Sequence, residues 1–134
     1  MSLLTFKGGI HPNDGKSLAK DQPIKEVIPT GKMIYPLSQH IGAPATAIVA
    51  KGDAVLKGQK IAEAGGFVSA PIYSSVSGKV LALEKHLNPT GNSVDCIVIE
   101  NDGEHNEVEY SCSKALGELS KEEILNKIGE AGIV

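Results

Sequence analysis

The sequence predicts a mainly β fold, a small sandwich or barrel with an irregular N-terminal arm and one C-terminal helix. Three observations favour it. The 134 residues include 15 glycines, but only five aromatic side chains and no tryptophan. From residue 45 onward, short runs of Val, Ile, Leu and Ala alternate with tight turns. Apolar residues recur at helical spacing near the C-terminus alone, so a helical bundle is disfavoured.

The charge and composition exclude several classes of protein. Thirteen Lys and Arg residues stand against 16 Asp and Glu, and this net charge of −3 provides neither a basic surface for nucleic acid nor a polybasic membrane anchor. An apolar content of 41% supports a folded core. No apolar run is long enough to insert across a bilayer, and we expect no secretory signal. The two cysteines, Cys96 and Cys112, indicate a reduced cytosolic protein, with Cys96 a buried thiol.

Residues 1–33 form the expected arm, which we predict to pack on the barrel. Turn-forming residues dominate it, and residues 3–6 alone read as a strand. Residues 33–38 follow as an edge strand, because Pro36 has no N–H to donate to a central ladder.

Residues 34–112 form the expected β domain. Its strands are predicted at 45–50, 54–56, 60–64, 76–84 and 94–100, with a hairpin tip at Gly65-Gly66 and a loop over 88–92. Strands this short, separated by turns every few residues, are typical of a small sandwich or barrel.

Residues 113–134 are predicted to be a linker and a helix. Ser120 and Glu123 have the spacing of a capping box, an apolar stripe of Ile124, Leu125, Ile128 and Ala131 follows, and Gly132 is the expected stop. The stripe either packs back on the sandwich or belongs to a following domain. Because the sequence ends without a polar tail, we expect it to be a piece cut from a longer protein.

Two half-motifs sharpen the fold. The run from Gly52-Asp53 to Gly58-Gln59 resembles the first half-motif of lipoyl and biotinyl carrier domains, which are barrel-sandwich hybrids. Ala70-Pro71 followed by Ser77-Gly78-Lys79-Val80 resembles the second. Carrier domains present a lysine at the hairpin tip between the halves, where this sequence has Gly65-Gly66-Phe67. We therefore expect the carrier scaffold without the carrier function, since fold does not determine function.

A more specific resemblance extends over nearly the whole chain and is weakest at 13–32 and 85–118. Residues 5–12 (TFKGGIHP), 36–45 (PLSQHIGAPA), 52–61, 68–71 and 77–80 appear in the order found in the N-terminal region of the RnfC family, the C subunit of the Rnf electron-transport complex. Residues 119–123 and 131–134 resemble the stretch before the flavin- and NADH-binding domain of that family. The resemblance implies a non-catalytic scaffold domain of an ion-translocating ferredoxin:NAD+ oxidoreductase.

The same resemblance implies cofactors and partners. Family members use FMN and NADH and carry two [4Fe–4S] clusters, which require eight cysteines in C-x-x-C runs. This sequence has two cysteines, no C-x-x-C, no G-x-G-x-x-G and no P-loop, so we expect no catalytic, cofactor or metal site in it. The implied partners are the downstream NADH/flavin domain and other subunits of the complex, with no nucleic acid. The implied location is peripheral, on the cytoplasmic side of the bacterial cell membrane, without direct insertion.

The candidate residues are accordingly structural or interface residues: Gly8, Gly9, His11, Pro12, Gln39, His40, Gly52, Asp53, Gly58 and Gly78. His11 and His40 are read as bonded to backbone carbonyls that pin the arm, rather than as ligands or proton relays, since a metal site needs three or four convergent groups. Asp53 is read as a turn cap rather than as an acid–base partner of Glu63. His86 and His105 are expected in solvated loops, and Glu104, Glu107 and Glu109 on a solvated edge.

Two other hypotheses stay open at this point. One is a lipoyl- or biotinyl-type carrier domain with a displaced lysine, for which Lys60 and Lys79 are the lysines nearest to the hairpin tip. The other is a free-standing module that binds a small ligand, for which the sequence has no positive sign.

Overall fold

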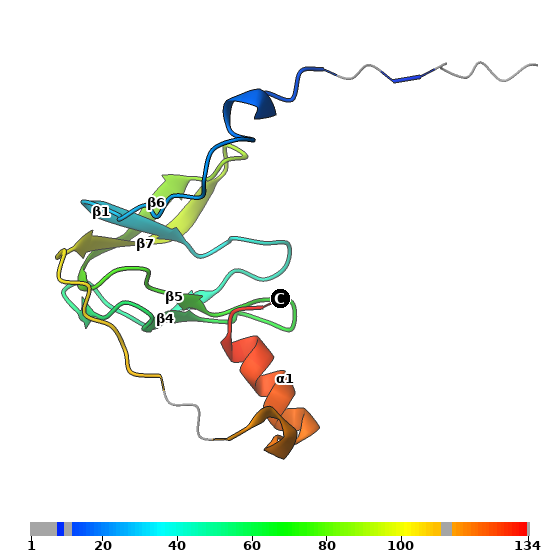
Figure 1. Cartoon of the computed structure of the whole chain (residues 1–134). Coiled ribbons are helices and arrows are strands. Elements are labelled where there is room, and N and C mark those ends of the chain that lie inside the picture. The colour runs from blue at the N-terminus through cyan, green and yellow to red at the C-terminus, as the bar shows by residue number, and fades with distance from the viewer. Residues whose placement is uncertain (1–7, 10–11, 111–113, 134) are drawn as a thin grey trace, which may run out of the picture.

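The computed structural model describes residues 8–9, 12–110 and 114–133. In that part of the chain, two antiparallel sheets pack together (Figure 1). The four-stranded sheet has the order β1-β7-β6-β3, formed by Lys32–Pro36, Ser93–Asn101, Gly78–Leu87 and Ala54–Val55. The three-stranded sheet has the order β2-β4-β5, formed by Thr46–Ala47, Lys60–Glu63 and Ile72–Tyr73. The helical elements are η1 (Lys16–Leu18), η2 (Leu116–Glu118) and α1 (Lys121–Glu130). The predicted mainly β class with one C-terminal α-helix is confirmed.

The core lies between the two sheets and consists mostly of aliphatic side chains. Its buried members are Tyr35, Ala45, Val55, Ile61, Ala62, Val76, Val80, Ile97 and Ile99. Tyr35 is the one aromatic residue among them, and its hydroxyl hydrogen-bonds the Ser75 Oγ at 2.9 Å, so its polar end is satisfied at the core boundary. Cys96 is 1% exposed, which confirms the expected buried thiol.

The long β6–β7 hairpin organises the larger sheet. Its register runs from Gly78 opposite Asn101 to Leu87 opposite Ser93. β1 pairs with the other side of β7, with Pro36 opposite Cys96, and so occupies the sheet edge that its proline predicts. The strand predicted at 45–50 is shorter than expected. Beyond β2 the Ala50 N–H donates to the Asp53 Oδ2 at 2.8 Å, so the chain turns there instead of continuing the ladder.

The described part of the arm projects from the sheets (Figure 1). Residues 12–28 are exposed. The predicted packing of the arm on the barrel is therefore not found for these residues. Large apolar side chains are few in this stretch (Leu18, Ile24, Val27 and Ile28), so packing them would bury little apolar area to offset the lost chain entropy. Two hydrogen bonds attach the end of the arm: the Asn101 Nδ2 donates to the Pro29 carbonyl at 2.7 Å, and the Asn101 N–H to the Gly31 carbonyl at 3.1 Å. The strand predicted at 3–6 lies outside the described residues.

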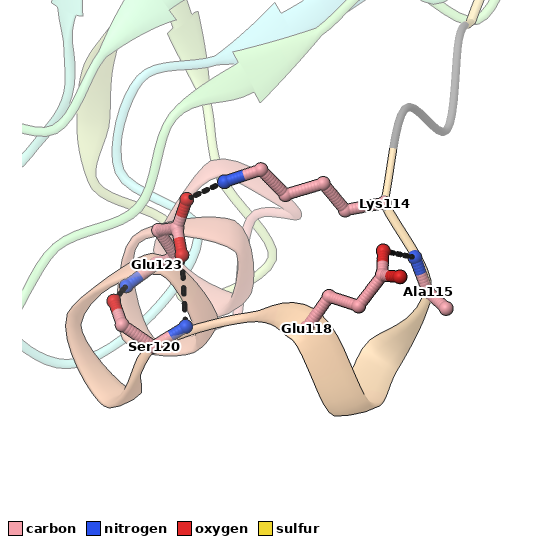
Figure 2. A network of polar contacts seen from close by, with 5 residues as sticks. All are labelled: Lys114, Ala115, Glu118, Ser120 and Glu123. Atoms are coloured by element: carbon pink, nitrogen blue, oxygen red, sulfur yellow. Dashed lines mark hydrogen bonds and ion pairs between the residues drawn. The ribbon is translucent and has the colours of Figure 1, made fainter.

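The C-terminal helix α1 begins with the predicted capping box (Figure 2). The Glu123 N–H donates to the Ser120 Oγ at 3.2 Å, and the Ser120 N–H donates to the Glu123 Oε2 at 2.8 Å. At the other end, Gly132 has a φ of 77°, a left-handed conformation that stops the helix as expected. Among the described residues, no helix has the length and apolar character needed to cross a membrane.

Candidate functional site

The candidate turn Gly52-Asp53 lies just before β3 and is hydrogen-bonded to β6. The Gly52 N–H donates to the Val80 carbonyl at 2.8 Å, and the Val80 N–H donates to the Asp53 carbonyl at the same distance. The Asp53 carboxylate accepts from Ala50 within the turn, whereas the Glu63 carboxylate pairs with the Lys60 Nζ at 3.1 Å. Each carboxylate is thus engaged with its own neighbours, and the arrangement has the character of a structural turn.

Gly58 and Gly78 each sit where another segment comes close. The Gly58 carbonyl accepts a hydrogen bond from the Tyr110 hydroxyl at 2.9 Å. A β-carbon on Gly78 would lie 1.9 Å from the carbonyl oxygen of Glu100 on β7, so the β6–β7 pairing has no space for a side chain there. Both glycines therefore allow close approach of segments distant in sequence.

Gln39 and His40 lie together in the loop after β1. The Gln39 Nε2 donates to the Pro36 carbonyl at 3.0 Å, and the His40 Nδ1 lies 3.0 Å from the Ile41 carbonyl oxygen. Both line a surface hollow of about 680 Å³, which also involves β1 and the 88–90 loop. His40 does contact a backbone carbonyl, but one in its own loop, so it does not pin the arm.

The arm candidates do not join this group. Gly8 and Gly9 are exposed, and a β-carbon on either would have no atom of another segment within 4 Å. Pro12 is exposed as well, and His11 lies outside the described residues. The structure thus brings Gln39 and His40 together but does not bring the described arm candidates to them.

One minor prediction needs correction. His86 is not in a loop, because β6 extends to Leu87, and its Nε2 lies 3.0 Å from the Glu84 Oε1. The acidic run is exposed, as expected, and within it Glu107 pairs with the Lys57 Nζ at 3.2 Å. Backbone hydrogen bonds of Lys57 to Asn106 and Val108 hold this segment against the barrel.

The donor set does not fit an iron–sulfur cluster. The described residues include no group of three or more His, Cys, Asp or Glu side chains placed to hold a metal ion. The whole sequence has two cysteines, and the Cys96 thiol is buried, donating to the Val94 carbonyl at 3.5 Å. A cluster held by four thiolates cannot form from these residues alone.

A polar network fixes the linker to the start of α1, as Figure 2 shows. The Lys114 Nζ donates to the Glu123 Oε1 at 2.6 Å, while the Ala115 N–H donates to the Glu118 Oε2 at 3.2 Å. The hydrogen bond from Lys114 lowers the pKa of Glu123, and the Ser120 N–H lowers it further. The same carboxylate therefore caps the helix and anchors the linker.

The end of α1 rests on the smaller sheet. The Tyr73 hydroxyl donates to the Glu130 carbonyl, and burial raises the pKa of Tyr73. A hollow of about 520 Å³ separates this end of the helix from the barrel, lined by Lys60, Tyr73, Tyr110, Lys127, Glu130 and Ala131. The polar tips of Lys60, Tyr73 and Tyr110 already have protein partners. We therefore interpret this hollow as part of the contact between α1 and the barrel rather than as a ligand site.

The apolar stripe of α1 is not packed on the sandwich. No residue of the helix is buried. Leu125 is 67% exposed and Ile128 is 42% exposed. Beside them runs an almost wholly apolar groove of about 220 Å³, lined by Leu119, Ile124, Lys127, Ile128, Ala131 and Ile133. Of the two alternatives for the stripe, packing back on the sandwich is therefore excluded for the described structure.

The sequence reasoning missed one feature, the exposed tip of the β4–β5 hairpin. Phe67 is fully exposed there, and Ile41 and Val68 are exposed beside it. The available signal was the position of an aromatic residue directly after Gly65-Gly66, at a point where a carrier domain would present its lysine.

Comparison with known proteins identifies the family. The family model described as "RnfC Barrel sandwich hybrid domain" matches residues 4–104. Over 98% of its length the chain is 45% identical to the C subunit of the proton-translocating ferredoxin:NAD(+) oxidoreductase complex of Clostridium ljungdahlii, covering 29% of that protein. It is 48% identical to the Na(+)-translocating counterpart of Acetobacterium woodii, over 74% of this chain and 22% of the relative. It is 34% identical to the C subunit of the ion-translocating oxidoreductase complex of Haemophilus influenzae, over 98% of this chain and 20% of the relative.

The chain thus spans less than a third of each of these relatives. The matched region includes both half-motifs and both sheets, which confirms the barrel-sandwich hybrid predicted from them. The chain belongs to the RnfC family and contains its barrel-sandwich hybrid domain.

Proposed function

We propose that this chain is a scaffold domain, without catalytic residues of its own, within the RnfC subunit of an ion-translocating ferredoxin:NAD+ oxidoreductase. The names of its relatives describe that activity for complete subunits, which are more than three times as long as the matched region. The electron-transfer chemistry then belongs to the remaining part of the subunit, which we expect to hold FMN, to react with NADH, and to carry two [4Fe–4S] clusters.

The observation that carries this proposal is the uncovered apolar face of α1. The helix has a complete capping box and is tied at both ends, to Lys114 and to Tyr73, yet it buries none of its residues. A helix of ten residues is only marginally stable in water without packing. We therefore infer that its apolar groove binds further polypeptide, namely the NADH/flavin domain of the same subunit.

We infer further that the subunit is peripheral and sits on the cytoplasmic side of the cell membrane. NAD and ferredoxin are soluble electron carriers of the cell interior, and a subunit that exchanges electrons with them must face that compartment. The net charge of −3 does not favour direct attraction to an anionic lipid surface. Contacts with the other subunits of the complex are thus expected to hold it at the membrane.

The carrier hypothesis is not favoured. The hairpin tip presents Phe67 in place of a lysine, and the nearby Lys60 is half-buried and paired with Glu63. That pairing raises the pKa of Lys60, which makes its amine a poorer nucleophile.

Two measurements on the 134-residue chain, once circular dichroism shows it to be folded, test the proposal. Titration with FMN and with NADH is expected to show no saturable binding, whereas the full-length protein binds both. Intact mass after co-expression with a lipoyl or biotinyl ligase is expected to be unchanged. Tight binding of either cofactor by the chain alone, or an adduct on any lysine, would contradict the assignment.

A further inference from the structure

A second uncovered apolar surface lies where the 37–45 loop meets the β4–β5 hairpin, and we call it the barrel tip. Its exposed apolar residues are Phe67, which is fully exposed, Ile41, which is 94% exposed, and Val68, which is 46% exposed. The two segments that form it, 37–45 and 64–72, contain no Asp, Glu, Lys or Arg. An ordinary solvated loop carries charged residues, whereas this surface exposes apolar side chains and carries none. In this respect the surface resembles the centre of a protein interface, where charged residues are depleted.

The barrel tip is held by contacts between and within its two segments. The Ala43 N–H donates to the Val68 carbonyl at 3.0 Å and so joins the two segments. Within 64–72, the Gly65 N–H donates to the Ser69 Oγ at 2.9 Å. A β-carbon on Gly65 would lie 1.9 Å from the Pro44 carbonyl oxygen, so the two backbones touch. The exposed Phe67 is therefore presented from a fixed base, which reduces the entropy lost when a partner covers it.

The end of α1 lies beside this surface (Figure 1). A β-carbon on Gly132 would be 3.4 Å from the carbonyl oxygen of Pro71, which belongs to the hairpin. The apolar groove of α1 ends at Ala131 and Ile133, next to that contact. Polypeptide that follows Ile133 thus starts where the groove and the barrel tip adjoin.

We infer that the barrel tip is a second docking surface for the same NADH/flavin domain that covers α1, with Phe67 inserted into an uncharged, apolar pocket of that domain. The inference rests on the proposed function, which supplies the domain. Aromatic residues, Phe among them, are enriched at protein interfaces, and charged residues are depleted at the interface core. Two contact surfaces around one connection hold the domain at a fixed angle, whereas one helix face would leave it free to pivot.

Two other occupants suit the surface less well. An anionic lipid surface is attracted by Lys and Arg residues, which both segments lack. A second copy of the chain would have to present the same projecting loops in a two-fold contact, and two such projections bury little of each other.

The inference is tested by comparing amide hydrogen–deuterium exchange rates in the full-length protein with those in a protein of residues 1–134. In the full-length protein, peptides covering 37–45 and 64–72, like those of α1, are expected to exchange at least about tenfold more slowly. Slowing in α1 but not in 64–72 would overturn this inference and leave the proposed function intact. Slowing in neither would contradict both. Slowing of 64–72 only after the other subunits or phosphatidylcholine vesicles are added would assign the surface to them and overturn the inference.

A matched pair of variants makes the test specific. Phe67→Ser in the full-length protein is expected to return exchange in 37–45 toward the rate of the isolated chain. Leu83→Ser removes a similarly apolar side chain, 48% exposed on β6, and is expected to change nothing at the tip. Because Phe67 is fully exposed in the described structure, the 134-residue chain should have the same melting temperature with Phe or with Ser at position 67. Unchanged protection in the full-length Phe67→Ser variant would refute the assignment.

Discussion

Gly78 is a position at which one added methyl group would collide with the backbone of the neighbouring strand. Its φ is 154°, and a β-carbon there would lie 1.9 Å from the Glu100 carbonyl oxygen and 2.9 Å from its carbon. Real β-carbons keep at least 3.0 Å from such atoms, so Gly78→Ala must move β6 and β7 apart by about 1.1 Å at this point. That displacement is roughly a quarter of the spacing between paired strands, which is about 4.8 Å.

The expected loss of stability follows from two contributions. A side chain in this backbone region costs about 1–3 kcal/mol in strain. Opening the strand pair weakens neighbouring backbone hydrogen bonds, among them the one from the Asp102 N–H to the Ser77 carbonyl at 3.1 Å. Two such bonds contribute roughly 2 kcal/mol. Gly78→Ala should therefore lower the free energy of unfolding by about 3–5 kcal/mol, a large share of the total for a chain of this size.

Urea unfolding followed by far-ultraviolet circular dichroism measures this loss, with Gly52→Ala as the control. Gly52 also has a positive φ, 101°, but a β-carbon there has no atom of another segment within 4 Å. The control therefore carries backbone strain alone, about 1–2 kcal/mol. If the two variants unfold within about 0.5 kcal/mol of each other, the close approach of β7 is not what excludes a side chain at Gly78.

Three further predictions concern the N-cap of α1, the turn after β7 and the contact between α1 and the smaller sheet. Ser120→Ala removes the capping hydroxyl and should destabilise α1 by about 1 kcal/mol, lowering the helical dichroism signal while leaving the urea midpoint of the barrel unchanged. The hydroxyl of Ser77 lowers the pKa of Asp102, so the carboxylate stabilises the fold above its unfolded-state pKa, and this stabilisation is lost as pH falls through the folded-state pKa. Asp102→Asn should therefore unfold with a shallower dependence on pH below about pH 5, and equal slopes would contradict this. Tyr73→Phe removes the hydrogen bond to Glu130 and should accelerate amide exchange in α1 roughly fivefold without affecting β6 or β7.

Local signals in the sequence predicted the elements whose causes are local. The capping box depends on two residues three positions apart, and Pro36 excludes itself from a central strand, so both predictions needed no knowledge of the fold. The requirement for glycine at Gly78 is different. The motif resemblance marked the position, but the reason for it is a carbonyl on β7, which no local pattern contains.

The incorrect strand bounds have two different causes, a contact with another strand in one case and a side-chain contact within a turn in the other. The neighbours of His86 lack strong strand propensity and so favour a loop, yet pairing with β7 extends β6 through it. The strand expected at 45–50 ends early because the Asp53 side chain takes the Ala50 N–H. In both cases a specific contact outweighs the local preference. The candidate interface residues Gln39 and His40 could be named from the sequence, but their position beside the 88–90 loop depends on how distant segments meet in the fold.

The hairpin tip occupies the position at which a carrier domain presents its lysine. A carrier domain uses the β4–β5 position to present a lysine away from the barrel, and the same geometry here leaves Phe67 fully exposed on a rigid base. Covering a phenylalanine side chain completely is worth about 2–3 kcal/mol, and none of that free energy is realised within the described chain. A substitution at Phe67 should therefore separate two properties that usually change together, weakening association while leaving the fold intact. Buried residues such as Ile61 cannot separate them, because their loss destabilises the barrel on which any interface depends.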